Sequence, residues 1–133
     1  MEVTYEQVKK DLRNLKHLEY SIQTFTQANE RLKRQYELHK KDGLSTEAEL
    51  EKLLEAIKRL DASKFIRKSI EKKDKYFSAI SQLEPMNQTI IVDSVINGVT
   101  YWKIGNKLGF SEIAIKKRVE RSIRQIMEII NNS

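Results

Sequence analysis

Several features are scarce in this 133-residue chain, which has no cysteine, one proline and four glycines. Without cysteine it forms no disulfide, thiolate zinc site or thiol nucleophile, and this suits a reducing cytoplasm. No apolar run approaches the roughly 20 residues that a membrane helix needs, and residues 1–6 lack the basic and apolar regions that open a signal peptide. We therefore expect a soluble, cytoplasmic protein that makes no membrane contact.

Catalytic chemistry has little support in the sequence. The two histidines, His17 and His39, fall on one predicted helix. At roughly 1.5 Å per residue they stand about 33 Å apart, so one chain cannot bring them to a shared metal. Carboxylates alternate with lysine and arginine as salt-bridge partners do, and the glycines suit turns, caps and close packing rather than a phosphate-binding loop. We expect no enzymatic activity, no cofactor and no metal site.

Positive charge is in moderate excess. The chain has 25 lysine and arginine residues against 19 aspartate and glutamate residues, a net charge of +6 and a pI near 9.5. Such a balance favours an anionic partner, and nucleic acid is the first class to consider. Residues 1–84 and 85–133 each carry a net charge of +3, so the shorter part has the higher density of net positive charge.

The first half of the chain is patterned as helices. Residues 4–41 contain no glycine or proline, and their apolar residues recur at helical spacings, which predicts one long helix. The breakers at 42–45 end it, and Thr46 with Glu49 matches a capping box that begins a second helix. Both apolar stripes are narrow, which predicts an antiparallel helical hairpin that self-associates as coiled coils do. The stripes consist of Val8, Leu12, Leu15, Leu18, Ile22, Phe25, Leu32 and Tyr36, and of Leu50, Leu53, Leu54, Ile57 and Leu60.

A bend is expected at residues 61–63, because Asp61 and Ser63 compete with the helical backbone for hydrogen bonds. The segment 64–83 beyond the bend either continues the second helix or forms a third one. Its basic window, residues 64–75, could hold DNA, although a solvated helix flank is at least equally expected.

Pro85, the single proline, separates the two halves of the chain. Proline disfavours helix in the residue before it and suits the first position of a helix, so a new helix is expected to begin here and to stop at Asn97-Gly98. We predict a helical hairpin or coiled-coil-like region over 1–84 and a three-helix domain over 85–133. The expected fold class is all-α.

The stretch 100–119 carries the strongest functional signal, because it is patterned as two short helices joined by a glycine turn. Thr100 and Ser111 stand where N-caps are expected, and Gly109 follows the last apolar residue of the first helix as a left-handed C′ residue does. Gly105 lies inside that helix, where glycine lowers helix stability by about 1 kcal/mol relative to alanine. Close packing of the second helix would explain why glycine is present there. These features predict a helix-turn-helix, a motif that binds DNA.

The second helix of this motif, residues 111–131, has an apolar stripe for the core and an opposite face that is free for DNA. Residues near its start are expected to read base edges in the major groove, and basic residues along its flanks to neutralise phosphates. A solvated basic face is the alternative, and the glycine and N-cap pattern favours DNA over it. The stripe is Ile115, Val119, Ser122, Ile126 and Ile130; the base-reading candidates are Glu112, Ile113, Lys116, Lys117 and Glu120; the phosphate candidates are Thr100, Arg118, Arg121 and Arg124.

Trp102, on the first helix of the motif, is an unusual residue for such a position. A surface tryptophan can anchor a partner or stack on a sugar-phosphate. Packing against the N-terminal helices is the preferred expectation.

The run from Leu83 to Val119 resembles region 4 of sigma-70-type factors, and it is similar to the sigma-like C-terminal segment of phage transcriptional regulators of the ArpU and RinA type. The likeness rests on the motif Gly, apolar, Thr, Tyr, two residues, Ile, Gly, two residues, Leu, Gly, apolar, Ser, Glu over 98–112, and on Arg118-Val119. It implies promoter binding in the major groove and, for sigma proteins, contact with RNA polymerase. Residues 1–84 show no likeness to the sigma segment that opens promoters, so a phage or mobile-element regulator is expected rather than a complete sigma factor.

Two other functions would use the same features. A protein-interaction adaptor, for instance on RNA polymerase, would dock through Trp102, Ile113 and the carboxylates of Glu112 and Glu120. A phage DNA-packaging protein would combine DNA binding with assembly into a ring. Salt-dependent DNA binding separates a regulator from an adaptor, and the oligomeric state identifies a packaging protein.

Overall fold

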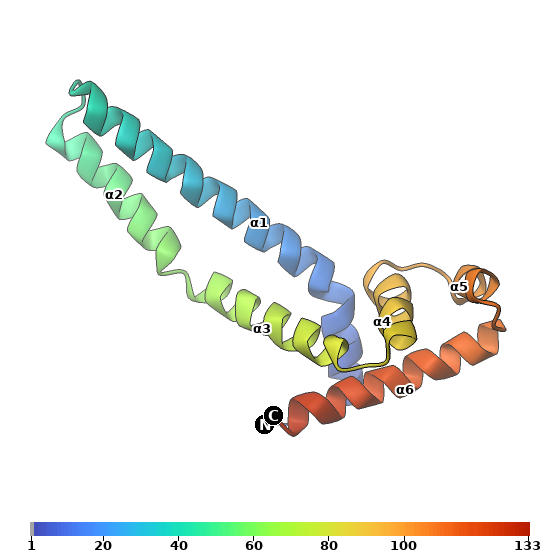
Figure 1. The fold of residues 1–133 in the computed structure, drawn as a ribbon. Coiled ribbons are helices and arrows are strands. Elements are labelled where there is room, and N and C mark those ends of the chain that lie inside the picture. Colours follow the sequence, from blue (N-terminus) through green and yellow to red (C-terminus); the bar gives the residue numbers. More distant parts are fainter. Residues whose placement is uncertain (1) are drawn as a thin grey trace. The chain divides into compact units, whose positions relative to one another are not determined.

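The computed structural model describes residues 2–133, and over these residues the chain is helical and has no β-strand (Figure 1). The expected all-α class is confirmed. No helix in residues 2–133 has the length and apolar character that crossing a membrane requires. The helices are α1 (Tyr5–Asp42), α2 (Glu47–Asp61), α3 (Lys64–Ser81), α4 (Pro85–Ile91), α5 (Tyr101–Leu108) and α6 (Glu112–Asn131), with a π-helical segment at Val92–Ile96 that follows α4 directly.

The helix ends follow local signals in the sequence. The hydroxyl of Thr46 accepts a hydrogen bond from the backbone N–H of Glu49 at 3.2 Å, as an N-cap does. The bend at residues 61–63 separates α2 from α3, so the segment beyond it is a third helix rather than a continuation of the second. Pro85 lies in the first turn of α4, where its missing N–H has no helical partner to lose.

The chain packs as two compact units. One unit consists of the residues up to Leu18 together with Glu71–Ser133, and the other is Glu19–Ile70. Pro85 is a boundary between the helices α3 and α4, whereas the two units divide within α1 and within α3. Residues from the predicted N-terminal region 1–84 therefore take part in both units.

The first unit has a hydrophobic core built from distant parts of the sequence. The backbone N–H of Val3 donates to the side-chain oxygen of Asn131 at 2.8 Å, and the amide group of Asn131 donates back to the carbonyl of Val3 at 3.0 Å. The start of the chain is thus fastened to the end of α6. The buried apolar residues are Val8, Leu12, Leu15, Tyr76, Ala79, Ile80, Leu83, Ile90, Ile91, Ile104, Ile115, Val119, Ile123, Ile126 and Ile130.

A buried carboxylate joins α1 to α3 inside this unit. Asp11 is only 5% exposed, and its two oxygens accept from the Tyr76 hydroxyl at 2.6 Å and from the Gln7 amide at 3.0 Å. The ammonium of Lys72 lies 2.9 Å from the same carboxylate. Burial and the hydrogen bond to Asp11 raise the pKa of Tyr76 well above its usual value, so the phenol remains a proton donor. Burying Asp11 is tolerable because these three donors compensate it.

Replacing Tyr76 with phenylalanine should destabilise the first unit by about 2 kcal/mol, because one oxygen of buried Asp11 loses its donor. Urea unfolding followed by circular dichroism measures the loss. Tyr20→Phe is the matched control, since Tyr20 is 71% exposed, and it should change stability by less than about 0.5 kcal/mol. Equal stability of the Tyr76→Phe chain and the parent would contradict the role assigned to this network.

The second unit, Glu19–Ile70, has a thin core. Within it, α1 and α2 lie side by side (Figure 1), and the side-chain amide of Asn29 on α1 donates to the carboxylate of Asp61 at the end of α2 at 2.8 Å. Among the apolar residues of this unit, Ile57 and Ile66 are buried. In this unit, the apolar residues of the two stripes predicted to face each other on α1 and α2 are mostly half-buried.

Ser122 is, besides Asp11, a buried polar residue in the first unit. It is fully buried, and its hydroxyl has no hydrogen-bond partner. An unpaired buried hydroxyl costs about 1 to 3 kcal/mol. Ser122→Ala removes that cost and should raise the free energy of unfolding by about 1 kcal/mol.

The control for Ser122 is Ser69, which is 4% exposed and whose hydroxyl donates to the carbonyl of Phe65 at 2.8 Å. Ser69→Ala loses a made hydrogen bond and should be neutral or destabilising. Urea midpoints that fall by the same amount for both variants would show that the Ser122 hydroxyl is paired after all.

Candidate nucleic-acid interface

The link between α5 and α6 is a tight glycine turn. Gly109 has φ of 79°, the left-handed conformation that a residue with a Cβ adopts only at a cost. The carbonyl of Gly105 accepts from the N–H of Gly109 at 2.8 Å and from the N–H of Phe110 at 2.9 Å. These two bonds close the end of α5 and turn the chain into α6.

Gly105 is required by close packing, but the nearest atoms belong to the turn at Phe110 and Ser111 and not, as the sequence pattern predicted, to the second helix. A Cβ placed on this residue would lie 2.4 Å from the carbonyl oxygen of Phe110, which is a backbone atom. Any side chain at this position therefore pushes the turn away from α5. The close approach of α5 to the turn thus depends on glycine at position 105.

Gly105→Ala should destabilise the chain by about 2 kcal/mol, because the cost of overpacking exceeds the gain of about 1 kcal/mol in helix propensity. The neighbouring exposed residue provides the control: Asn106→Ala lies on the same helix and should be neutral or slightly stabilising. Thermal and urea unfolding measure both. A Gly105→Ala chain more stable than the parent would show that the turn relaxes freely.

Hydroxyl caps begin both helices of this part of the chain. Thr100 accepts from the N–H of Lys103 at 3.3 Å, and Ser111 accepts from the N–H of Ala114 at 3.1 Å. Both caps match the sequence prediction. The first turn of α6 is exposed at its start, so its positive dipole end is accessible to an anion such as a phosphate.

The inner face of α6 is the predicted apolar stripe, and its burial is confirmed. All five expected residues of the stripe are buried, from Ile115 to Ile130. Ile123 is buried as well and was missed. Its spacing of four from Val119 and three from Ile126 is the signal that could have found it, since it widens the stripe at helical period.

The candidates for base reading lie on the other side of α6, in its first three turns. Glu112, Ile113, Lys116 and Lys117 are exposed, and Glu120 is half-buried. Ile113 is 68% exposed, which is high for an apolar side chain. The helix thus brings two lysines, two carboxylates and one apolar side chain to a single surface.

The three arginines among the phosphate candidates differ in their exposure. Arg121 and Arg124 are exposed, and the Arg124 guanidinium lies 6.0 Å from the centre of the Tyr5 ring. Arg118 is half-buried: it lies 4.7 Å from the centre of the Phe110 ring and donates to the side chain of Asn87 at 3.3 Å. Through these two contacts Arg118 also links the turn to α4.

Burial raises the pKa of Tyr5, and the carboxylate of Glu120 acts in the same direction. Tyr5 therefore remains neutral beside Arg124, and its ring lies close to that arginine at the flank of α6. The sequence pattern did not link Tyr5 to α6.

Trp102 does not pack on the N-terminal helices, and that expectation was wrong. Its side chain is 61% exposed on α5. The reason is helical phase: Ile104, which is buried, lies two residues further on, and two residues correspond to about 200° around a helix. When Ile104 faces the core, Trp102 faces the opposite side.

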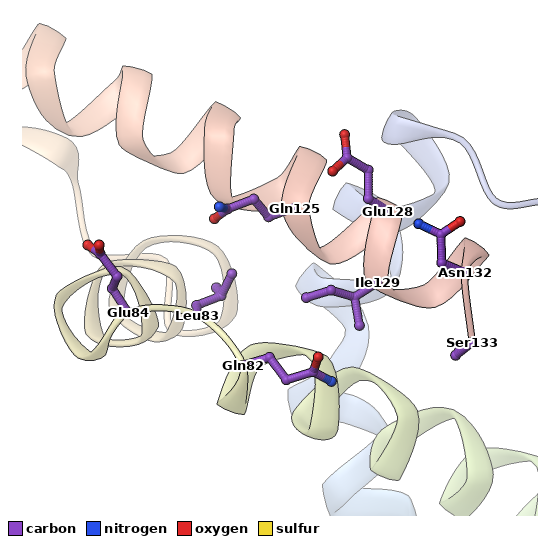
Figure 2. A pocket seen from close by; sticks show the side chains of 8 residues that line it. All are labelled: Gln82, Leu83, Glu84, Gln125, Glu128, Ile129, Asn132 and Ser133. Atoms are coloured by element: carbon purple, nitrogen blue, oxygen red, sulfur yellow. The ribbon is translucent and has the colours of Figure 1, made fainter.

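A cleft in the first unit has the wrong charge for DNA. It has a volume of about 570 Å³ and lies between the α3–α4 junction and the last turns of α6 (Figure 2). Its lining includes the carboxylates of Glu84 and Glu128 and the amides of Gln82 and Gln125, and no lysine or arginine. Phosphate binding there would meet repulsion rather than attraction.

Metal ligands do not gather in the part of the chain that the structure describes. Residues 2–133 contain no group of three or more histidine, cysteine, aspartate or glutamate side chains placed to hold an ion. His17 and His39 are exposed along α1.

Comparison with known protein families, with curated proteins and with solved structures finds no match to this chain.

Proposed function

We propose that this protein is a sequence-specific DNA-binding transcriptional regulator of phage or mobile-element origin, which acts in the cytoplasm. In this proposal α5 and α6 form a sigma-region-4-like helix-turn-helix within residues 85–133, and α1 and α2 form a helical hairpin that mediates self-association. The observation that carries the proposal is the exposed, mainly basic face of α6, which lies opposite a fully buried stripe and begins at a capped, glycine-based turn.

Sequence would be read by the first turns of α6 in the major groove. Lys116 and Lys117 are exposed donors that suit the O6 and N7 acceptors of guanine. The carboxylates of Glu112 and Glu120 suit the N4 amino group of cytosine, and Ile113 suits the methyl group of thymine. Such a surface distinguishes bases by hydrogen bonding and by apolar contact together.

Affinity would come mainly from phosphate contacts. Arg121 and Arg124 extend from the flank of α6, Arg118 lies on α6 against Phe110 of the turn, and Thr100 precedes α5 as its N-cap. Each neutralised phosphate releases counterions, so binding should weaken steeply with salt. With the three arginine contacts, affinity should fall about fortyfold between roughly 50 and 200 mM salt.

The self-associated form would meet two half-sites. Two helix-turn-helix units related by a two-fold axis read sites about 34 Å apart along the duplex. The likeness to sigma factors adds RNA polymerase as a proposed protein partner.

Two substitutions on α6 separate base reading from phosphate binding. Lys117→Ala should change the preferred sequence, with a loss of about 1 to 3 kcal/mol on a selected duplex and little loss on a random one. Arg121→Ala should weaken binding to both duplexes equally and reduce the salt slope by about one. Selection from a random duplex library, followed by fluorescence anisotropy at two salt concentrations, measures these effects.

Lys58→Ala is a control for the loss of one positive charge, because Lys58 is exposed on α2 and lies outside both α6 and the basic window 64–75. It should leave the affinity for both duplexes within about twofold of the parent, since isolated surface charges act weakly at physiological salt. Equal losses on selected and random duplexes for both α6 variants would overturn the assignment of roles.

A protein-docking function is the second candidate, favoured by two exposed apolar residues. Trp102 is 61% exposed and Ile113 is 68% exposed, and both residue types suit a protein interface. An adaptor would show no salt-dependent DNA binding. It would lose its partner on substitution of Trp102, while a DNA-binding regulator would keep its sequence preference.

A further inference from the structure

The α1–α2 part of the second unit carries opposite charges on its two helices. Residues 31–41 near the end of α1 contain five basic and one acidic residue, whereas residues 47–55 at the start of α2 contain four acidic and one basic residue. The two stretches lie at the same end of the helix pair, next to the turn at 42–46 (Figure 1). One end of this unit is therefore strongly positive on one helix and strongly negative on the other.

Each charged stretch borders a shallow groove that contains apolar surface. The basic groove lies along α1 and is lined by Lys33, Arg34, Leu38 and Lys41, together with Glu37. Leu38 is 59% exposed there. The acidic groove is lined by Glu47 and Glu51 of α2 together with the half-buried side chains Tyr36, Leu50 and Leu54.

Most of these charges have no ion-pair partner within the described residues. Within the described residues, the ion pairs are Lys33 with Asp61 at 4.0 Å and Lys72 with Asp11. Arg34, Lys41, Glu47 and Glu51 take part in neither pair. The second unit, whose core is thin, thus has unpaired charges and exposed apolar surface that a partner can contact.

We propose that the partner is a second copy of this chain, with the basic groove of each copy seated on the acidic groove of the other. The pairing is self-complementary, because a two-fold axis parallel to the helices places α1 of each copy beside α2 of the other and so makes the two contacts equivalent. It produces a four-helix bundle in which Leu38 of each copy meets the apolar floor of the partner's acidic groove. Self-association through these grooves does not require DNA, since it uses none of the residues assigned to α6.

A charge-swap experiment tests this pairing directly. The acid variant carries Arg34→Glu and Lys41→Glu, so both of its grooves are negative; the base variant carries Glu47→Lys and Glu51→Lys, so both are positive. Each variant alone should self-associate about a hundredfold more weakly than the parent, because like charges meet. An equimolar mixture should restore a one-to-one complex, because negative grooves then face positive ones.

Analytical ultracentrifugation of the full chain, with native mass spectrometry of the mixture, gives the readout. Lys64→Glu with Lys68→Glu on α3 is the matched control, since both residues are exposed and basic but line neither groove; it should self-associate like the parent. Circular dichroism checks that every variant keeps its helix content. A parent chain that is monomeric at micromolar concentration, or a mixture that stays monomeric while both variants remain folded, would overturn the proposal.

Discussion

Burial of a single stripe of α6 is the constraint on which the candidate interface depends. Because the apolar stripe of α6, from Ile115 to Ile130, is buried in one core with residues of α1, α3, α4 and α5, the helix cannot rotate about its axis without exposing apolar surface. Its opposite face, with Lys117 and Arg121, is thereby held outward. A recognition helix needs this property, since base reading requires side chains in a defined register. Tying Val3 to Asn131 holds the far end of the same helix in place.

Much of the local structure could be predicted because its causes are local. The caps at Thr46, Thr100 and Ser111 depend on a hydroxyl and an N–H three residues apart, which the sequence displays directly. The turn at Gly109 and the close packing at Gly105 follow in the same way from the special backbone and the small size of glycine. The candidate site inherits this predictability, because the exposed face of α6 is set by its period.

The long-range packing could not be predicted, since nothing in a single sequence pairs distant residues. Asp11 stands in a charged helix and looks like an ordinary solvated carboxylate, yet Tyr76, 65 residues away, donates to it in the core. A single sequence also does not predict that α1 begins in the first unit and continues into the second. The expectation that Trp102 packs against the N-terminal helices was wrong for a different reason, because the helical phase set by Ile104 places Trp102 on the exposed side of α5.

The central claim, that α6 binds duplex DNA through the face opposite its buried stripe, is tested most directly by nuclear magnetic resonance. The ¹⁵N-labelled chain is titrated with a duplex selected for binding, and amide shifts are followed residue by residue. The account predicts that the largest changes fall between Ser111 and Arg124 and around Thr100, while residues 19–70 change little. Absence of shift changes in α6, or changes confined to residues 19–70, would contradict it.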